Sequence, residues 1–105
     1  MKSPILRRIP KRRIVEAKRL LTTIDLEDKM DEILGIIEKV YGIKPWLLSG
    51  RSSAFLLSGL IYLIAKRNGA VITQSEIGEA FRVTELTIRN SCRFWKDMAE
   101  STDLG

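Results

Sequence analysis

The sequence predicts an all-α domain built from five helices. Apolar residues recur every three or four positions in five separate segments, which is the pattern of helices that bury one face. The short β-branched segment at residues 70–72 has no second segment to pair with, so we expect a loop there. A chain of 105 residues that is 45% hydrophobic is long enough for one such domain and too short for two.

The N-terminal part of the chain is expected to contain a basic arm and two helices. Residues 1–10 hold two prolines and an excess of basic residues, so we expect an extended arm or interdomain linker with little structure. The domain itself is expected over residues 11–99. Its first helix is expected to run from Lys11 to about Thr22. Its second is expected to begin after Asp25, a good N-cap, and to end at Gly42. The polar face of this second helix is acidic and would repel a phosphate backbone.

The third helix, residues 51–66, is expected at the centre of the domain. Its sequence is apolar nearly all round, and a helix without a polar face is normally surrounded by other helices. Ser58 and Gly59 are small enough to let neighbouring helices approach closely. The preceding connection contains Trp46, Leu47 and Leu48, which we expect to fold back on the core.

Residues 73–98 contain two helical patterns separated by a short turn, which is the layout of a helix-turn-helix unit. The first helix opens with a capping box between Thr73 and Glu76, and the second follows the N-cap Thr84. The second helix buries an apolar stripe made of Ile88, Cys92, Trp95 and Met98. Another face carries Leu86, Arg89, Asn90 and Arg93. The core has no use for these four side chains, so this is the face expected to meet DNA. Residues 100–105 are expected to form a frayed tail.

The composition gives no support for an enzyme, a metal site or a cofactor. The chain has no histidine and one cysteine, which excludes Ser-His and Cys-His pairs, imidazole-containing zinc sites and an internal disulfide. It also lacks phosphate-binding glycine loops. Its longest apolar run, residues 54–65, is well short of the ~20 residues that cross a bilayer, and no signal peptide is visible. We therefore expect no membrane partner.

The net charge of +5 is concentrated at one end of the chain. Six basic residues and no acid occupy residues 1–13, and the remainder carries twelve basic against thirteen acidic residues. Such an arm could follow a phosphate backbone or dock on an acidic protein surface, and charge alone does not choose between them.

With these residues in place, the chain resembles the second cyclin-like repeat of archaeal transcription factor B and eukaryotic transcription factor IIB. The resemblance covers Ile9 to Met98 and is most specific in TQSEIGEA (Thr73 to Ala80) and RVTELTIRN (Arg82 to Asn90). The start of the third helix at Gly50, Arg51 and Ser52 supports it, as does the segment Leu60 to Ala65. The resemblance implies a five-helix cyclin-like fold with a C-terminal helix-turn-helix.

The resemblance also implies a function and a set of contacts. The family clamps TATA-box-binding protein on double-stranded promoter DNA and reads the element upstream of the TATA box through the major groove. Carried over by position, the base-contacting candidates are Leu86, Arg89 and Asn90. The phosphate-contacting candidates are Arg51, Arg82, Thr84, Thr87 and Arg93. The expected compartment is the archaeal cytoplasm, with the DNA, or the nucleus in a eukaryote.

Some features depart from the family pattern. Arg82 stands where many helix-turn-helix turns have glycine, so a left-handed backbone there would cost roughly 1 kcal/mol. Ser53, Ser58 and Gly59 replace a proline and two alanines of the family, which bears on packing only. The zinc ribbon and the first repeat are missing, so RNA polymerase would be reached only through regions outside this chain. The chain is then a fragment of a full factor or a lone-repeat relative.

Three functions remain open from the sequence: a promoter-binding module of a basal initiation factor, an independent DNA-binding regulator, and a cyclin-like box that docks on a protein. In the third case Arg89 and its neighbours would be an ordinary solvated helix surface.

Overall fold

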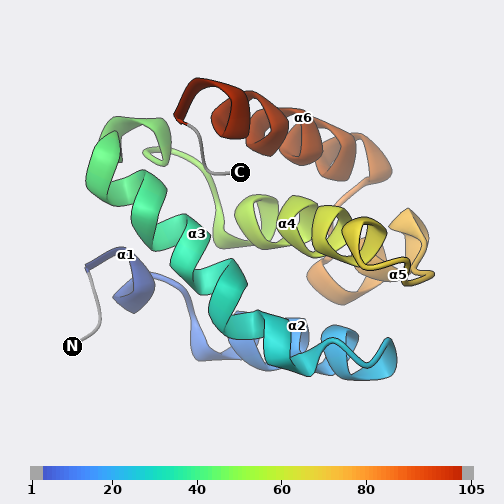
Figure 1. The fold of residues 1–105 in the computed structure, drawn as a ribbon. Coiled ribbons are helices and arrows are strands. Elements are labelled where there is room, and N and C mark those ends of the chain that lie inside the picture. The colour runs from blue at the N-terminus through green and yellow to red at the C-terminus, as the bar shows by residue number, and fades with distance from the viewer. Residues whose placement is uncertain (1–3, 103–105) are drawn as a thin grey trace.

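The computed structural model describes residues 4–102, in which α-helices surround one core (Figure 1). The helices are α1 (Pro4–Arg7), α2 (Lys11–Thr23), α3 (Met30–Ile43), α4 (Ser53–Arg67), α5 (Gln74–Phe81) and α6 (Glu85–Thr102). Single 3-10 turns at Glu27–Lys29 and Pro45–Leu47 precede α3 and α4. No strand occurs within residues 4–102, so the predicted all-α class is confirmed, and α2 to α6 correspond to the five expected helices.

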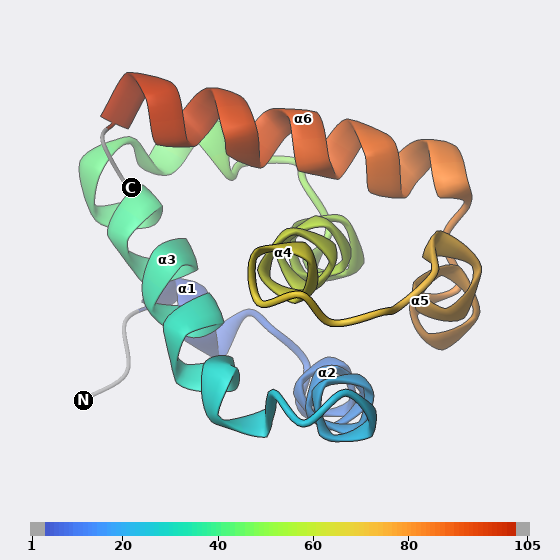
Figure 2. The ribbon, with the colours of Figure 1, turned by 45° about the vertical axis from the view of Figure 1, so that its right-hand side comes forward.

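The centre of the domain is α4, as its sequence predicted. Figure 2 shows α4 nearly end-on, with α2, α3, α5 and α6 around it, and each of these four helices contacts it. Its buried residues include the run from Leu56 to Ile61, so it has no face turned wholly to solvent. None of the helices in the described part of the chain is both long and apolar enough to cross a bilayer.

The prediction of an extended segment before Lys11 is wrong for the residues that the structure describes. Pro4–Arg7 forms a helical turn against α3, and Ile5 and Ile9 are both buried in the core. Proline at the first position of a helix is well tolerated, and Ile5 in this turn and Ile9 in the segment after it both contribute to the core. The charge excess of the segment concealed these two apolar residues. Residues 1–3 lie outside the described part of the chain.

The expected N-cap Asp25 has a different role. It adopts a left-handed backbone with φ of 59°, and the Leu26 amide donates to the Leu21 carbonyl at 2.8 Å. This is the hydrogen bond that closes a helix C-terminus, so Asp25 ends α2 instead of starting α3, and aspartate tolerates that backbone better than most residues. The next helix begins at Met30 without a side-chain cap, and Gly42 lies inside it.

Two further expectations about chain ends and loops differ from the structure. Leu48 folds back on the core as expected, but Trp46 is 66% exposed. The backbone remains helical to Thr102, beyond the point where fraying was expected, and Met98, near the end of α6, is still buried in the core. The prediction of a frayed tail at residues 103–105 lies outside the described residues.

Candidate nucleic-acid interface

The first helix of the helix-turn-helix, α5, starts with the predicted capping box. The Thr73 hydroxyl accepts from the Glu76 amide at 3.0 Å, and the Glu76 carboxylate accepts from the Thr73 amide at 3.0 Å. Both hydrogen bonds satisfy amides that a helix N-terminus leaves without partners. Ile77 and Phe81 then anchor α5 in the core.

The turn between α5 and α6 is built on a left-handed arginine. Arg82 has φ of 57° and ψ of 47°, and the Val83 amide donates to the Gly78 carbonyl at 3.0 Å. Gly78 is required there, because a Cβ would lie 2.7 Å from the Val83 carbonyl oxygen. The expected strain at Arg82 is therefore present, since a side chain makes this backbone less favourable than glycine would.

The second helix, α6, begins as predicted at the N-cap Thr84. Its hydroxyl accepts from the Thr87 amide at 3.1 Å and lies 3.0 Å from the Thr87 hydroxyl. Glu85 follows in the first turn, where the helix dipole favours an acid. The two threonines thus fix the start of α6, and Thr84 remains exposed beside it.

The inner side of α6 is held against α4 by packing and by hydrogen bonds. The predicted stripe is confirmed, because Ile88, Cys92, Trp95 and Met98 are all buried. Trp95 Nε1 donates to the Leu56 carbonyl at 3.0 Å, and the Ser91 hydroxyl donates to the Phe55 carbonyl. A Cβ on Gly59 would lie 2.1 Å from Ser91 Oγ, so the close approach expected at Gly59 is also confirmed. These contacts fix how α6 is rotated about its own axis.

The outer side of α6 carries the predicted base-contacting residues. Leu86 is 60% exposed, and Arg89, Asn90 and Arg93 are exposed with it. Arg89 and Arg93 also border a shallow hollow of about 460 Å³ that reaches Tyr62 and Gln74. The structure therefore brings these four side chains onto one solvent-facing surface, next to the end of α6 that follows the turn. Figure 2 shows that end beside α5, with α6 running across the view.

Arg51 lies apart from the phosphate-contacting candidates in the turn and at the start of α6. Its guanidinium donates to the Leu47 carbonyl and its Cζ lies 4.5 Å from the centre of the Phe94 ring. Phe94 is roughly 15 Å along α6 from Thr84, at 1.5 Å rise per residue. Arg51 thus has a structural role of its own, in joining the start of α4 to the middle of α6.

Cys92 is a buried thiol, as its position on the apolar stripe predicted. Its Sγ lies 3.8 Å from the Gly59 carbonyl oxygen, with the thiol as donor. Burial raises the pKa of this thiol above its usual value of 9.0, and the positive charge of Lys96 partly opposes that rise. A protonated thiol facing the core is unsuited to nucleophilic chemistry.

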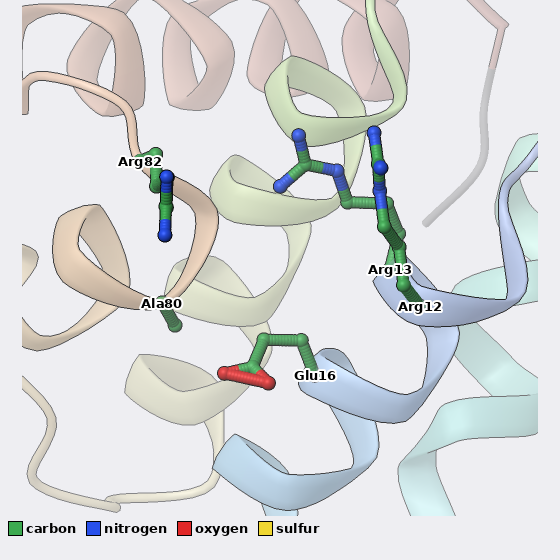
Figure 3. A pocket seen from close by; sticks show the side chains of 5 residues that line it. All are labelled: Arg12, Arg13, Glu16, Ala80 and Arg82. Carbon is green, nitrogen blue, oxygen red and sulfur yellow. The ribbon is translucent and has the colours of Figure 1, made fainter.

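Sequence reasoning missed a basic hollow beside the turn. Arg12, Arg13 and Glu16 of α2 face Ala80 and Arg82 across a space of about 500 Å³ (Figure 3). Arg13 Nη1 also donates to the Phe81 carbonyl at 3.1 Å, which joins α2 to the C-terminus of α5. The charge pattern alone groups Arg12 and Arg13 with the basic N-terminus, and only the packing of α2 against α5 shows which part of the molecule they face.

The sequence of the chain is similar to that of known transcription factors. The family model described as the transcription factor TFIIB repeat matches residues 16–98. A transcription initiation factor IIB of Thermococcus kodakarensis is 31% identical over 96 residues, covering 83% of this chain and 31% of the relative. The Pyrococcus furiosus protein named transcription initiation factor IIB is 33% identical over 92 residues, covering 79% and 30%.

The chain thus spans about a third of the length of these curated relatives. No solved structure matches it significantly. The family match includes α4, α5 and most of α6. It therefore covers all the base- and phosphate-contacting candidates, whereas Arg12 and Arg13 of the basic hollow lie before its first residue. On these grounds the chain belongs to the family of the transcription factor TFIIB repeat.

Proposed function

We propose that the chain is a DNA-binding module of a basal transcription initiation factor and that α6 enters the major groove upstream of a TATA box. The supporting observation is the split of α6 into two sides. Leu86, Arg89 and Asn90 are exposed although the same helix is locked to α4 through Trp95 and Ser91. A rigidly held helix with free polar and apolar side chains near its start is what major-groove reading requires.

Each proposed base contact follows from the chemistry of base edges. Arg89 has two parallel N–H donors that match the O6 and N7 acceptors of guanine. Asn90 can both donate and accept, which suits the N7 and N6 edge of adenine. Leu86, 60% exposed, offers an apolar surface to a thymine methyl group or a pyrimidine edge.

The proposed phosphate contacts surround this base-reading surface. Thr84 and Arg82 lie at the start of α6 and in the turn, where a helix N-terminus and a cation both favour a phosphate. Arg93 lies one turn beyond Arg89, and Thr87 supports Thr84 through its hydroxyl. Arg51 belongs to this set only if DNA reaches the middle of α6, because its guanidinium rests on Phe94.

The charge distribution of the rest of the domain agrees with this orientation. In Figure 2, α3 lies across α4 from α5, and its sequence contains the acidic residues Asp31, Glu32 and Glu38. Glu32 of α3 also pairs with Arg67 at 3.6 Å and with Lys29 at 3.8 Å. Repulsion between carboxylates and phosphates would be greatest on that side, so DNA is favoured at the α5 and α6 side.

A partner on the same DNA follows from the small size of the proposed contact. One helix and about six phosphate contacts give weak binding at physiological salt, because the buried area is at the low end for specific complexes. We propose TATA-box-binding protein as that partner. If that protein is already bound to the neighbouring TATA box and also contacts this chain, the effective concentration of the chain at its own DNA site rises, and a weak contact becomes sufficient.

The test is a set of gel shifts on a duplex containing a TATA box and its upstream flank, with and without TATA-box-binding protein. Arg89→Ala is expected to weaken sequence-selective binding by about 1 to 3 kcal/mol. Lys39→Ala on α3 is the control and should change little, since Lys39 lies among acidic residues on the far side of α4.

The outcomes separate the three functions. Binding that needs TATA-box-binding protein supports the proposal. Equally selective binding without it would identify an independent DNA-binding regulator. No selective binding would overturn the proposal in favour of a protein-docking module, and selective binding that Arg89→Ala leaves unchanged would overturn the assignment of base reading to this face of α6.

A further inference from the structure

The hollow between α2 and the helix-turn-helix turn has the composition of an anion site. Three guanidinium groups line it, from Arg12 and Arg13 on one side and Arg82 on the other, against the single carboxylate of Glu16 (Figure 3). The carboxylate of Glu16 also lies 3.7 Å from Arg19 on the same helix, so this ion pair compensates part of its negative charge. The balance of charge facing the space is therefore positive.

The hollow is held in shape by the fold. Arg13 donates one N–H to the Phe81 carbonyl at 3.1 Å, so its guanidinium is oriented before any ligand binds. Arg82 is set by the left-handed turn, with φ of 57°. The backbones that carry the three arginines are therefore held in place and the Arg13 guanidinium is already oriented, whereas the exposed Arg12 and Arg82 side chains must still be ordered by a ligand.

We infer that this hollow binds a phosphate group, and that the phosphate belongs to the backbone of the DNA that α6 reads. Guanidinium groups match phosphate oxygens with paired hydrogen bonds, and a space of about 500 Å³ open to solvent admits a phosphate still attached to its strand. Arg82 lies two residues before the N-cap Thr84, so the hollow adjoins the end of α6 that enters the groove.

That the phosphate comes from DNA rests on the proposed function. That the hollow binds a phosphate group rests on its three guanidinium groups alone. Arg12 and Arg13 of α2 would thereby join the interface, although neither belongs to the helix-turn-helix. In that case α2 would hold the DNA backbone while α6 reads the bases. Protein–DNA complexes in general divide their contacts in this way, with phosphate contacts that position the protein and base contacts that give specificity.

The first arm of the test measures how affinity for the promoter duplex depends on salt, with TATA-box-binding protein present. Arg12→Gln and Arg82→Gln should each reduce the slope of log affinity against log salt by about 0.9, the contribution of one phosphate contact. Each should also lower affinity by about two- to fivefold at low salt, the size of an exposed ion pair. In the double variant, the reduction of the slope should be about twice that of either single variant.

Two variants serve as matched controls in this arm. Lys18→Gln removes one exposed positive charge from the same helix outside the hollow, and it should leave the slope unchanged. Glu16→Gln removes the carboxylate of the hollow and should raise affinity. Circular dichroism of each variant checks the fold, and Arg13 is left intact because it also bonds to Phe81.

The second arm uses inorganic phosphate without DNA. Phosphate is titrated against chloride at equal ionic strength, and the side-chain N–H signals of Arg12, Arg13 and Arg82 are followed by NMR. Saturable shifts in the wild type, together with loss of the Arg13 shift in the Arg12→Gln, Arg82→Gln double variant, support a phosphate-binding hollow. If they occur while every salt slope matches that of Lys18→Gln, the ligand is free phosphate and the DNA assignment is overturned.

The remaining outcomes separate this inference from the proposed function. If Arg89→Ala abolishes selectivity but Arg12→Gln and Arg82→Gln behave like Lys18→Gln, and phosphate causes no shifts, the inference fails and the proposed function stands. If no form of the chain binds the duplex, the proposed function fails, and the phosphate titration alone decides whether the hollow is an anion site.

Discussion

The two sides of α6 obey different constraints. On the inner side Ser91 and Trp95 are buried and donate to backbone carbonyls of α4, and the backbone of Gly59 approaches Ser91 so closely that no larger residue fits. On the outer side Leu86 and Arg89 are exposed. The inner side therefore determines the stability and orientation of the helix, whereas the outer side is free to change without cost to the fold.

This difference teaches how a small domain can present a reading surface. A helix that contacts DNA must not rotate about its axis, because a small rotation moves every side chain off its base. Ser91 and Trp95 bond to the carbonyls of Phe55 and Leu56, two neighbouring residues of α4. These two hydrogen bonds, about one turn apart along α6, oppose such a rotation. Substitutions on the inner side should therefore lower stability first, and those on the outer side should lower binding alone.

The largest expected effect is at Trp95. Trp95→Ala removes a buried indole and leaves the Leu56 carbonyl without its donor, so the free energy of unfolding should fall by about 3 to 5 kcal/mol. Urea denaturation followed by circular dichroism measures it. Trp46→Ala is the matched control, because Trp46 is 66% exposed and should change stability by less than about 0.5 kcal/mol. Equal losses in the two variants would show that the inner side is no more constrained than the surface.

The close approach of α4 and α6 is tested by a pair of glycine substitutions with opposite signs. Gly59→Ala places a Cβ 2.1 Å from Ser91 Oγ and 2.8 Å from the Ser91 carbonyl carbon. Overpacking of this kind should destabilise the domain by about 1 to 3 kcal/mol. Gly35→Ala in α3 meets nothing within 4 Å and should stabilise it by up to about 1 kcal/mol through helix propensity. Thermal melting compares the two, and a stabilised Gly59→Ala would mean that the helices can separate freely.

The parts of the fold that were predictable from sequence depend on neighbours along the chain. The capping box at Thr73, the stripe through Trp95 and the all-apolar α4 are local patterns with one favourable outcome. The errors at Ile5 and Asp25 arose where two outcomes were possible, and a tertiary contact decided the first while a local helix-closing hydrogen bond decided the second. Ile5 packs near α3, and Asp25 closes one helix where the same residue type could equally have opened the next.

The candidate site divides in the same way. Exposure of Arg89 could be predicted because the buried stripe leaves one face of α6 free, and the structure confirms that exposure while DNA contact stays a prediction. The hollow formed by Arg12 and Arg82 could not be predicted, because the two residues are seventy positions apart in the sequence and meet only through the packing of α2 on α5. Trp46 was assigned to the core by residue type alone, and its exposure shows the limit of that argument.

A smaller effect is expected at the turn, where stability and binding should move in opposite directions. Arg82→Gly relieves the left-handed backbone at φ of 57° and should raise the free energy of unfolding by about 1 kcal/mol. It also removes a proposed phosphate contact, so DNA affinity should fall. Urea denaturation and gel shifts on the same protein sample measure both. Arg82→Lys is the control, since it keeps the charge and the strain, and a stability equal to that of the glycine variant would contradict the strain argument.

The smallest effect concerns the pH dependence of stability at Cys92. Because burial raises the pKa of this thiol in the folded state above 9.0, the unfolded chain gives up the proton first as pH rises. The contribution of Cys92 to stability is therefore fully present below about pH 9 and falls as pH rises from there through the folded-state pKa. Urea denaturation at several pH values should show a steeper alkaline loss for wild type than for Cys92→Ala, which lacks the thiol and keeps every other ionisable group. Parallel profiles would mean that the inner side of α6 admits the thiolate as readily as solvent does, and the contrast between the two sides of the helix would not extend to charge.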